Sequence, residues 1–134
     1  MSNTVVKQRT LQSEVTLKGI GLHTGKEVTL TFKPAAENHG YAFSRTDLEG
    51  SPVIQAKAEF VTETQRGTNL ENKGIQINTS EHVLAALVGL EVDNCLIEMN
   101  SPEPPIMDGS SKYFVEAIEK AGVIEQEATR DEYI

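Results

Sequence analysis

Glu81 and His82 are adjacent residues whose side chains could support hydrolysis at a metal ion. An imidazole can hold a divalent cation while a nearby carboxylate takes the proton of a water molecule that attacks a carbonyl group. Neighbours on a helix point about 100° apart, so both can reach one cleft only near a helix end. The chain has three histidines, and no second one follows at the spacing of His-Glu-x-x-His. Because a catalytic zinc needs several protein ligands, the pair alone does not establish a metal site.

Four other residues are weaker candidates for binding or structure. His23 lies in a turn with glycines on both sides, which either allows a ligand to approach the backbone or serves the dihedral angles of the turn itself. Arg66, before Gly and Thr, offers a cation and backbone donors to a phosphate, but a single arginine is a weak signal. Asp108 precedes a predicted helix, where a carboxylate is more often a cap than a catalytic group. His39 lies in a predicted exposed turn and receives no role.

The first half of the chain has the patterns of β-strands. Residues 26–33 alternate between apolar and polar side chains, and Pro34 ends the run. Residues 15–17 precede a glycine-rich turn, so the two segments are expected to form a hairpin with a broad loop. Further short strands are predicted at residues 41–45, 53–56, 74–78 and 95–99.

Two amphipathic helices are predicted in the second half. The first follows Thr79 or Ser80, either of which can cap it, and runs to Gly89 with an apolar stripe. The stripe consists of Val83, Leu84, Leu87 and Val88. The second begins near Ser110 or Ser111, stops at Gly122, and repeats apolar residues at helical spacing. Its apolar residues are Phe114, Ala117, Ile118 and Ala121. Several strands with two such helices predict an α+β fold, a two-layer sandwich in which both helices pack on one face of a mostly antiparallel sheet.

Length and composition limit the class of protein. The 134 residues suffice for one ordinary domain, and the formal net charge of −8 disfavours binding to nucleic acid. A single cysteine, Cys95 in an apolar run, cannot form an internal disulfide and suits a reducing cytoplasm. No apolar run reaches the ~20 residues of a membrane-spanning helix, so we expect a cytoplasmic protein without a transmembrane segment. The acidic, poorly patterned residues 123–134 are expected to be a solvated tail or a linker.

Three segments together resemble one enzyme family, the UDP-3-O-acyl-N-acetylglucosamine deacetylases. Their order and approximate spacing match the family over most of residues 5–122. The segments are Gly19-Ile20-Gly21-Leu22-His23-Thr24-Gly25, then Thr79-Ser80-Glu81-His82-Val83-Leu84-Ala85-Ala86-Leu87 with Asp93-Asn94, and finally Pro105-Ile106-Met107-Asp108-Gly109-Ser110.

The resemblance implies a hydrolase of lipid A synthesis in Gram-negative bacteria, in which a zinc-bound water releases acetate from a UDP-linked, 3-O-acylated glucosamine. By position, Glu81 resembles the general base and His82 one zinc ligand, although iron is also compatible with such ligands. His23 and Arg66 fall in motif regions as candidates for substrate binding. The family has two domains, and its second domain supplies a His and an Asp, with a Lys after the His, as the other zinc ligands, and a further His as an acid.

The resemblance therefore predicts that residues 1–122 form the first of two domains and residues 123–134 a linker or the start of the second. With one imidazole for the metal, the 134-residue chain alone is expected to bind zinc weakly and to lack deacetylase activity. Two alternatives stay open at this point. The chain could be a non-catalytic interaction domain with an exposed apolar face, or a module that binds a UDP-sugar through the turn around His23.

Overall fold

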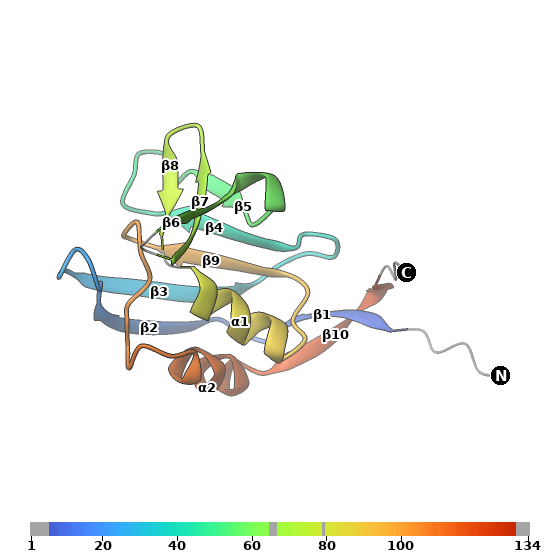
Figure 1. Ribbon diagram of the computed structural model, residues 1–134. Helices are drawn as coiled ribbons and strands as arrows, with labels where there is room; N and C mark the ends of the chain where they lie inside the picture. Colours follow the sequence, from blue (N-terminus) through green and yellow to red (C-terminus); the bar gives the residue numbers. More distant parts are fainter. Residues whose placement is uncertain (1–5, 65–66, 79, 131–134) are drawn as a thin grey trace.

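The computed structural model describes residues 6–64, 67–78 and 80–130, which form strands and two helices (Figure 1). The elements in chain order are β1 (Lys7–Leu11), β2 (Val15–Ile20), β3 (Glu27–Pro34), β4 (Tyr41–Arg45), β5 (Val53–Gln55), a 3-10 turn (Ala58–Phe60), β6 (Val61–Thr64), β7 (Gly67–Asn72), β8 (Ile75–Ile77), α1 (Glu81–Gly89), β9 (Cys95–Met99), α2 (Lys112–Ala121) and β10 (Val123–Thr129).

The central sheet has five strands in the order β2-β3-β9-β4-β5. All neighbours pair antiparallel except β4 and β9, which are parallel. The predicted alternation in β3 is confirmed, because Val28, Leu30 and Phe32 are fully buried while the residues between them are partly exposed. The predicted α+β fold with a mostly antiparallel sheet is therefore confirmed.

The predicted hairpin is formed by β2 and β3, which pair from Val15 opposite Phe32 to Ile20 opposite Glu27. Its turn is closed by two backbone hydrogen bonds, from Gly21 N–H to the Lys26 carbonyl (2.9 Å) and from Gly25 N–H to the Gly21 carbonyl (3.0 Å). Gly25 has a φ of 68°, a conformation that glycine adopts without the strain of a side chain. Gly25 thus serves the conformation of the turn itself.

Both helices cover the same face of the five-stranded sheet, as predicted (Figure 1), and the structure also packs them on each other. Helix α2 buries all four residues of its predicted apolar stripe. Helix α1 buries Val83, Ala86 and Leu87 instead of the full predicted stripe, and Val88 is 62% exposed. The assignment of Val88 to the buried face was wrong because it lies about 100° around the helix from Leu87, on the side away from the sheet. Within the described residues, neither helix is long and apolar enough to cross a membrane.

A second, two-stranded sheet joins β1 and β10, from Lys7 opposite Thr129 to Leu11 opposite Val123. This pair extends away from the helices as a ribbon (Figure 1). The expectation that residues 123–134 are an unpatterned tail was therefore wrong for β10. The strand escaped notice because none of its residues is fully buried and the partly covered ones, Val123, Gln126 and Ala128, do not alternate strictly. The proposed domain boundary at residue 122 stays a prediction.

A third sheet, β6-β7-β8, lies beside β5 and was predicted only in its last strand. Arg45, at the end of β4, ties it to the central sheet. The buried guanidinium donates to the Gln76 carbonyl (2.8 Å) and forms two hydrogen bonds with the Asp47 carboxylate (2.9 and 2.8 Å). This bond pattern holds the pKa of Asp47 below its ordinary value, mainly through the hydrogen bonds from Arg45.

Candidate functional site

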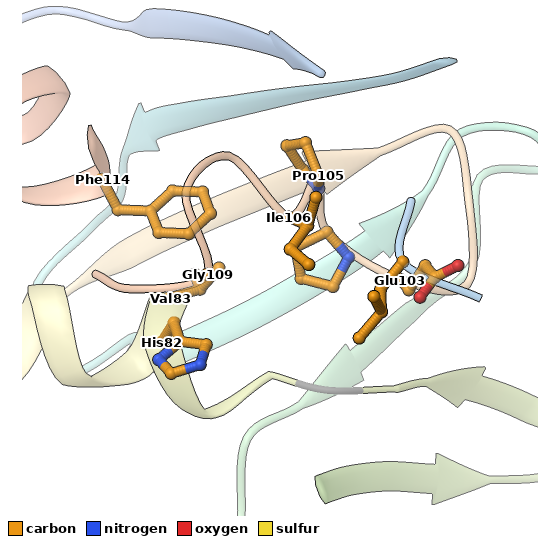
Figure 2. Close-up of a pocket in the computed structure, with 9 residues that line it drawn as sticks. His82, Val83, Glu103, Pro105, Ile106, Gly109 and Phe114 are labelled. Atoms are coloured by element: carbon orange, nitrogen blue, oxygen red, sulfur yellow. The ribbon is translucent and has the colours of Figure 1, made fainter. Parts of the chain in front are cut away.

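A pocket of about 100 Å³ lies where the first residues of α1 meet the loop between β9 and α2 (Figure 2). Its lining residues are mostly apolar, with one histidine and one glutamate among them. The lining residues are Leu22, His82, Val83, Glu103, Pro104, Pro105, Ile106, Gly109 and Phe114. An apolar hollow with a few polar groups is the usual form of a small-molecule site.

His82 reaches this pocket from the first turn of α1, and Glu81 begins the same helix. Both residues are partly buried. Glu81 is not one of the described residues that line the pocket. An acidic residue in the first turn is favourable because the helix dipole is positive there. The structure thus brings His82 to a cavity and leaves Glu81 beside it. Ser80, at the N-cap position, does not make the expected capping bond through its side chain, and Thr79 lies outside the described residues.

The turn between β2 and β3 forms one side of the pocket through Leu22. His23, next in the chain, is exposed, and its backbone N–H donates to both carboxylate oxygens of Glu103 (3.1 and 3.0 Å). The N–H of Thr24 donates to the same carboxylate (2.6 Å). Sequence reasoning missed Glu103; the available signal was a charged residue enclosed by prolines in a loop next to a motif.

Of the other candidates, Arg66 lies outside the described residues. His39, expected in an exposed turn, is partly buried instead, with a ring nitrogen 3.0 Å from the Gly40 carbonyl. Asp108 accepts hydrogen bonds from the backbone (3.0 Å) and hydroxyl (2.6 Å) of Ser110, and the hydroxyl bond holds the pKa of Asp108 below its ordinary value. The Ser110 hydroxyl in turn accepts from the N–H of Lys112, the first residue of α2. Asp108 therefore supports the helix start through Ser110, which fits the structural role expected for it.

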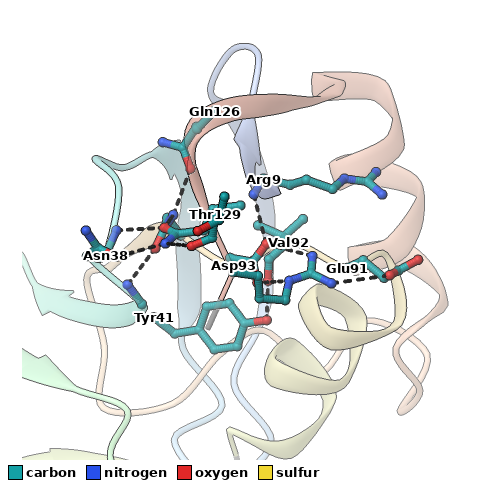
Figure 3. Close-up of polar contacts among 12 residues, drawn as sticks. Arg9, Asn38, Tyr41, Glu91, Val92, Asp93, Gln126 and Thr129 are labelled. Carbon is teal, nitrogen blue, oxygen red and sulfur yellow. Dashed lines mark hydrogen bonds and ion pairs between the residues drawn. The ribbon is translucent and has the colours of Figure 1, made fainter. Parts of the chain in front are cut away.

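A separate polar cluster joins both ends of the described chain to the turn after α1 (Figure 3). Asp93 accepts two hydrogen bonds from the Arg130 guanidinium (both 2.8 Å) and one from the backbone of Arg9 (2.8 Å). The Tyr41 hydroxyl donates to the Val92 carbonyl, and burial raises the pKa of Tyr41 to about 12. These groups satisfy one another, so the cluster serves to hold strands together.

The described residues do not form a complete metal site, because they contain no group of three or more His, Cys, Asp and Glu side chains placed to share one ion. The His82 imidazole faces the pocket and is chemically suited to be one ligand. Cys95 is unsuited, since it is fully buried and burial raises the pKa of its thiol to about 12. The remaining ligands of a metal at His82 would have to come from outside the described residues.

Comparison with known proteins gives one consistent match. Residues 8–134 match the family model described as UDP-3-O-acyl N-acetylglycosamine deacetylase. The chain is 53% identical over 130 residues, or 97% of its length, to the "Bifunctional enzyme LpxC/FabZ" of Bacteroides thetaiotaomicron, of which it covers 28%. It is 48% identical over 124 residues to the UDP-3-O-acyl-N-acetylglucosamine deacetylase of Myxococcus xanthus, covering 92% of this chain and 40% of that protein. The chain thus spans less than half the length of these curated relatives.

Proposed function

Because the chain belongs to the UDP-3-O-acyl N-acetylglycosamine deacetylase family, we propose that the full-length protein carrying this segment removes the N-acetyl group from a UDP-linked, 3-O-acylated glucosamine during lipid A synthesis. The family match over residues 8–134 carries the proposal. The pocket that contains His82 supports it, since it offers a metal-ligating side chain within an apolar hollow. The single, buried cysteine is in keeping with a reaction in the cytoplasm.

We assign His82 as one ligand of a zinc ion, with the others supplied by a second domain of the full-length protein. Zinc, when bound, would polarise the acetyl carbonyl and make water acidic enough to lose a proton near neutral pH. An iron ion can be held by the same kinds of ligand. One imidazole alone holds zinc weakly, so the 134-residue chain by itself is expected to release no acetate.

We assign Glu81 as the general base of the reaction. Its carboxylate would take a proton from the attacking water, whose oxygen then bonds to the acetyl carbon. The C–N bond would then break, the sugar nitrogen would leave as an amine with a proton from the further His expected in the second domain, and acetate would be released. Glu81 and His82 are neighbours at the first turn of α1, so a single rigid element sets the distance between the proton acceptor and the metal ligand.

The experiment compares Glu81→Gln and His82→Ala in the full-length protein, with bound zinc and acetate release measured on the same samples. Glu81→Gln should keep the metal and lower kcat by about 10²–10⁴-fold, because an amide cannot accept the proton. His82→Ala should lower zinc occupancy. Glu91→Gln, beyond the opposite end of α1 and with a 66% exposed side chain, is the matched control and should change neither quantity.

Equal loss of zinc in the Glu81 and His82 variants would overturn these two assignments. Failure of the metal-loaded, full-length protein to release acetate from a UDP-linked, 3-O-acylated N-acetylglucosamine would overturn the proposed function. Clear acetate release by the 134-residue chain alone would contradict the view that a second domain completes the site.

A further inference from the structure

Glu103 is a buried carboxylate whose described partners are backbone groups. The residue is only 2% exposed, and in the described part of the chain it forms no ion pair. Burying a carboxylate without partners is costly, so each such group in a fold needs hydrogen-bond donors. Here the donors are the N–H groups of His23 and Thr24, at 2.6–3.1 Å. The carboxylate is thus committed to the turn between β2 and β3.

Glu103 lines the pocket, but its carboxylate is bonded to the backbone amides of His23 and Thr24. Figure 2 shows the carboxyl oxygens turned away from His82, while the residue as a whole lines the pocket. Glu103 is consequently not placed as a partner of His82. Its own backbone N–H donates to the Ser101 hydroxyl (3.3 Å), which helps to fix the loop from which the side chain extends.

The turn between β2 and β3 makes further contacts with the loop between β9 and α2. The N–H of Ile106 donates to the carbonyl of Ile20 (2.8 Å), and Gly21 forms an isolated bridge with Pro105. A methyl group at Gly21 would lie 2.5 Å from the hydroxyl oxygen of Thr24 and 2.8 Å from a carboxylate oxygen of Glu103, so a larger residue would force these side chains to shift. The two segments fit together as one unit that supports the pocket.

Leu22 is the residue of the turn that lines the pocket. Its side chain lines the cavity although it is 55% exposed, so its position depends on the backbone of the turn more than on packing around it. The residue that follows, His23, is the one held by both carboxylate oxygens. A change at the Glu103 carboxylate would therefore remove hydrogen bonds from the two residues that follow Leu22 in the turn.

We propose that Glu103 is a positioning residue, which fixes the turn at residues 21–25 so that Leu22 forms a substrate-binding wall of the pocket. This inference rests on the proposed function for its kinetic consequences. The contact itself, between a buried carboxylate and two amide groups, can be tested without any activity.

The test uses Glu103→Gln in the full-length protein. One Glu103 oxygen accepts from both amides, and a glutamine oxygen in its place would keep these two hydrogen bonds without the charge. The NH₂ group of the glutamine would then face the N–H of His23, so that two donors would meet. Loss of such a charge-assisted arrangement should raise KM about tenfold and change kcat by less than about threefold. Glu98 on β9, whose carboxylate is paired with Lys33 on β3, provides the matched control, and Glu98→Gln should leave both constants unchanged.

A double-mutant cycle separates positioning from a general loss of stability. Leu22→Ala should raise KM by itself, and adding Glu103→Gln should raise it by no more than about twofold further, because both changes remove the same wall. Amide hydrogen exchange provides the second measurement. The amides of His23 and Thr24 should be protected in the unaltered protein and exchange at least about tenfold faster in the Glu103 variant.

Unchanged exchange at both amides in Glu103→Gln would overturn the inference, and so would additive effects on KM with Leu22→Ala. Faster exchange with an unchanged KM would also overturn it, because the turn would then be free to move without affecting the substrate. If the unaltered protein released no acetate, the proposed function would fall, and the exchange data would still decide whether Glu103 holds the turn.

Discussion

Asn94 is a buried side chain at which three segments of the chain meet, and its replacement should weaken the whole fold. The residue is 2% exposed and follows Asp93 in the turn before β9. Its amide nitrogen donates to side-chain oxygens of Gln8 on β1 (2.9 Å) and Gln126 on β10 (2.7 Å). Its amide oxygen accepts from the N–H of Gly40, just before β4 (2.8 Å).

The expected cost of Asn94→Ala follows from these three bonds. A buried hydrogen bond contributes about 1 kcal/mol net, so losing all three should lower the free energy of unfolding by about 3 kcal/mol. The surrounding groups cannot simply exchange partners. Gln8 uses its own NH₂ group for Asn38 and the Thr129 carbonyl, and Gln126 uses its NH₂ group for the Ala35 carbonyl.

Equilibrium unfolding in urea gives the measurement. The chain has no tryptophan and three tyrosines, so far-UV circular dichroism and tyrosine fluorescence are the suitable signals. The matched control is Asn100→Ala, which removes one exposed bond, from the N–H of Thr29 (2.9 Å). It should cost less than about 1 kcal/mol. If the slope of the free energy of unfolding against urea concentration is unchanged, a shifted midpoint reports a change in stability and not in the denatured state.

The reasoning would be refuted if Asn94→Ala cost no more than the Asn100 control. A second variant, Asn94→Asp, keeps the acceptor for Gly40 but places a carboxylate oxygen against the oxygens of Gln8 and Gln126. It should be at least as destabilising as alanine at neutral pH, because two bonds become repulsive contacts. A stable Asn94→Asp protein would show that the two glutamines reorient at little cost.

Two further predictions concern Cys95 and Asp47. Because Cys95 is fully buried and burial raises the pKa of its thiol to about 12, it should not react with a thiol reagent at neutral pH until the protein unfolds; prompt reaction of the folded protein would contradict its burial. Arg45 lowers the pKa of Asp47 from its ordinary 3.8, so the pair stabilises the fold above that pH and the contribution is lost as the pH falls through the lower, folded-state value. The difference in unfolding midpoint between the unaltered protein and Asp47→Asn should therefore shrink between about pH 5 and pH 2, whereas a constant difference would exclude this ionisation as the cause.

Elements with a strong local pattern could be predicted from the sequence. The alternation in β3, the glycine-rich turn after β2 and the apolar repeat of α2 each fix a local conformation through the period of their side chains. These elements confirm the α+β fold and the placement of both helices on one face. Pro34 and Gly122 also mark element ends as predicted.

Elements that depend on a distant partner were missed. Strands β1 and β10 pair across nearly the whole chain, and neither has enough apolar alternation to be seen alone. The parallel pairing of β4 with β9 is likewise a property of the assembled sheet. The placement of Val88 on the buried face failed for a related reason, since the helix pattern alone does not fix which side meets the sheet.

The candidate site shows the same division. The sequence by itself determined the family and the segments that carry Glu81 and His82, because these are matters of residue type and order. Only the tertiary structure placed His82 in a pocket and revealed the buried carboxylate of Glu103 behind the turn. A glutamate has the same identity whether it faces solvent or two backbone amides. Burial and hydrogen-bond partners are created when separate segments pack together, which is why they cannot be assigned from the order of residues alone.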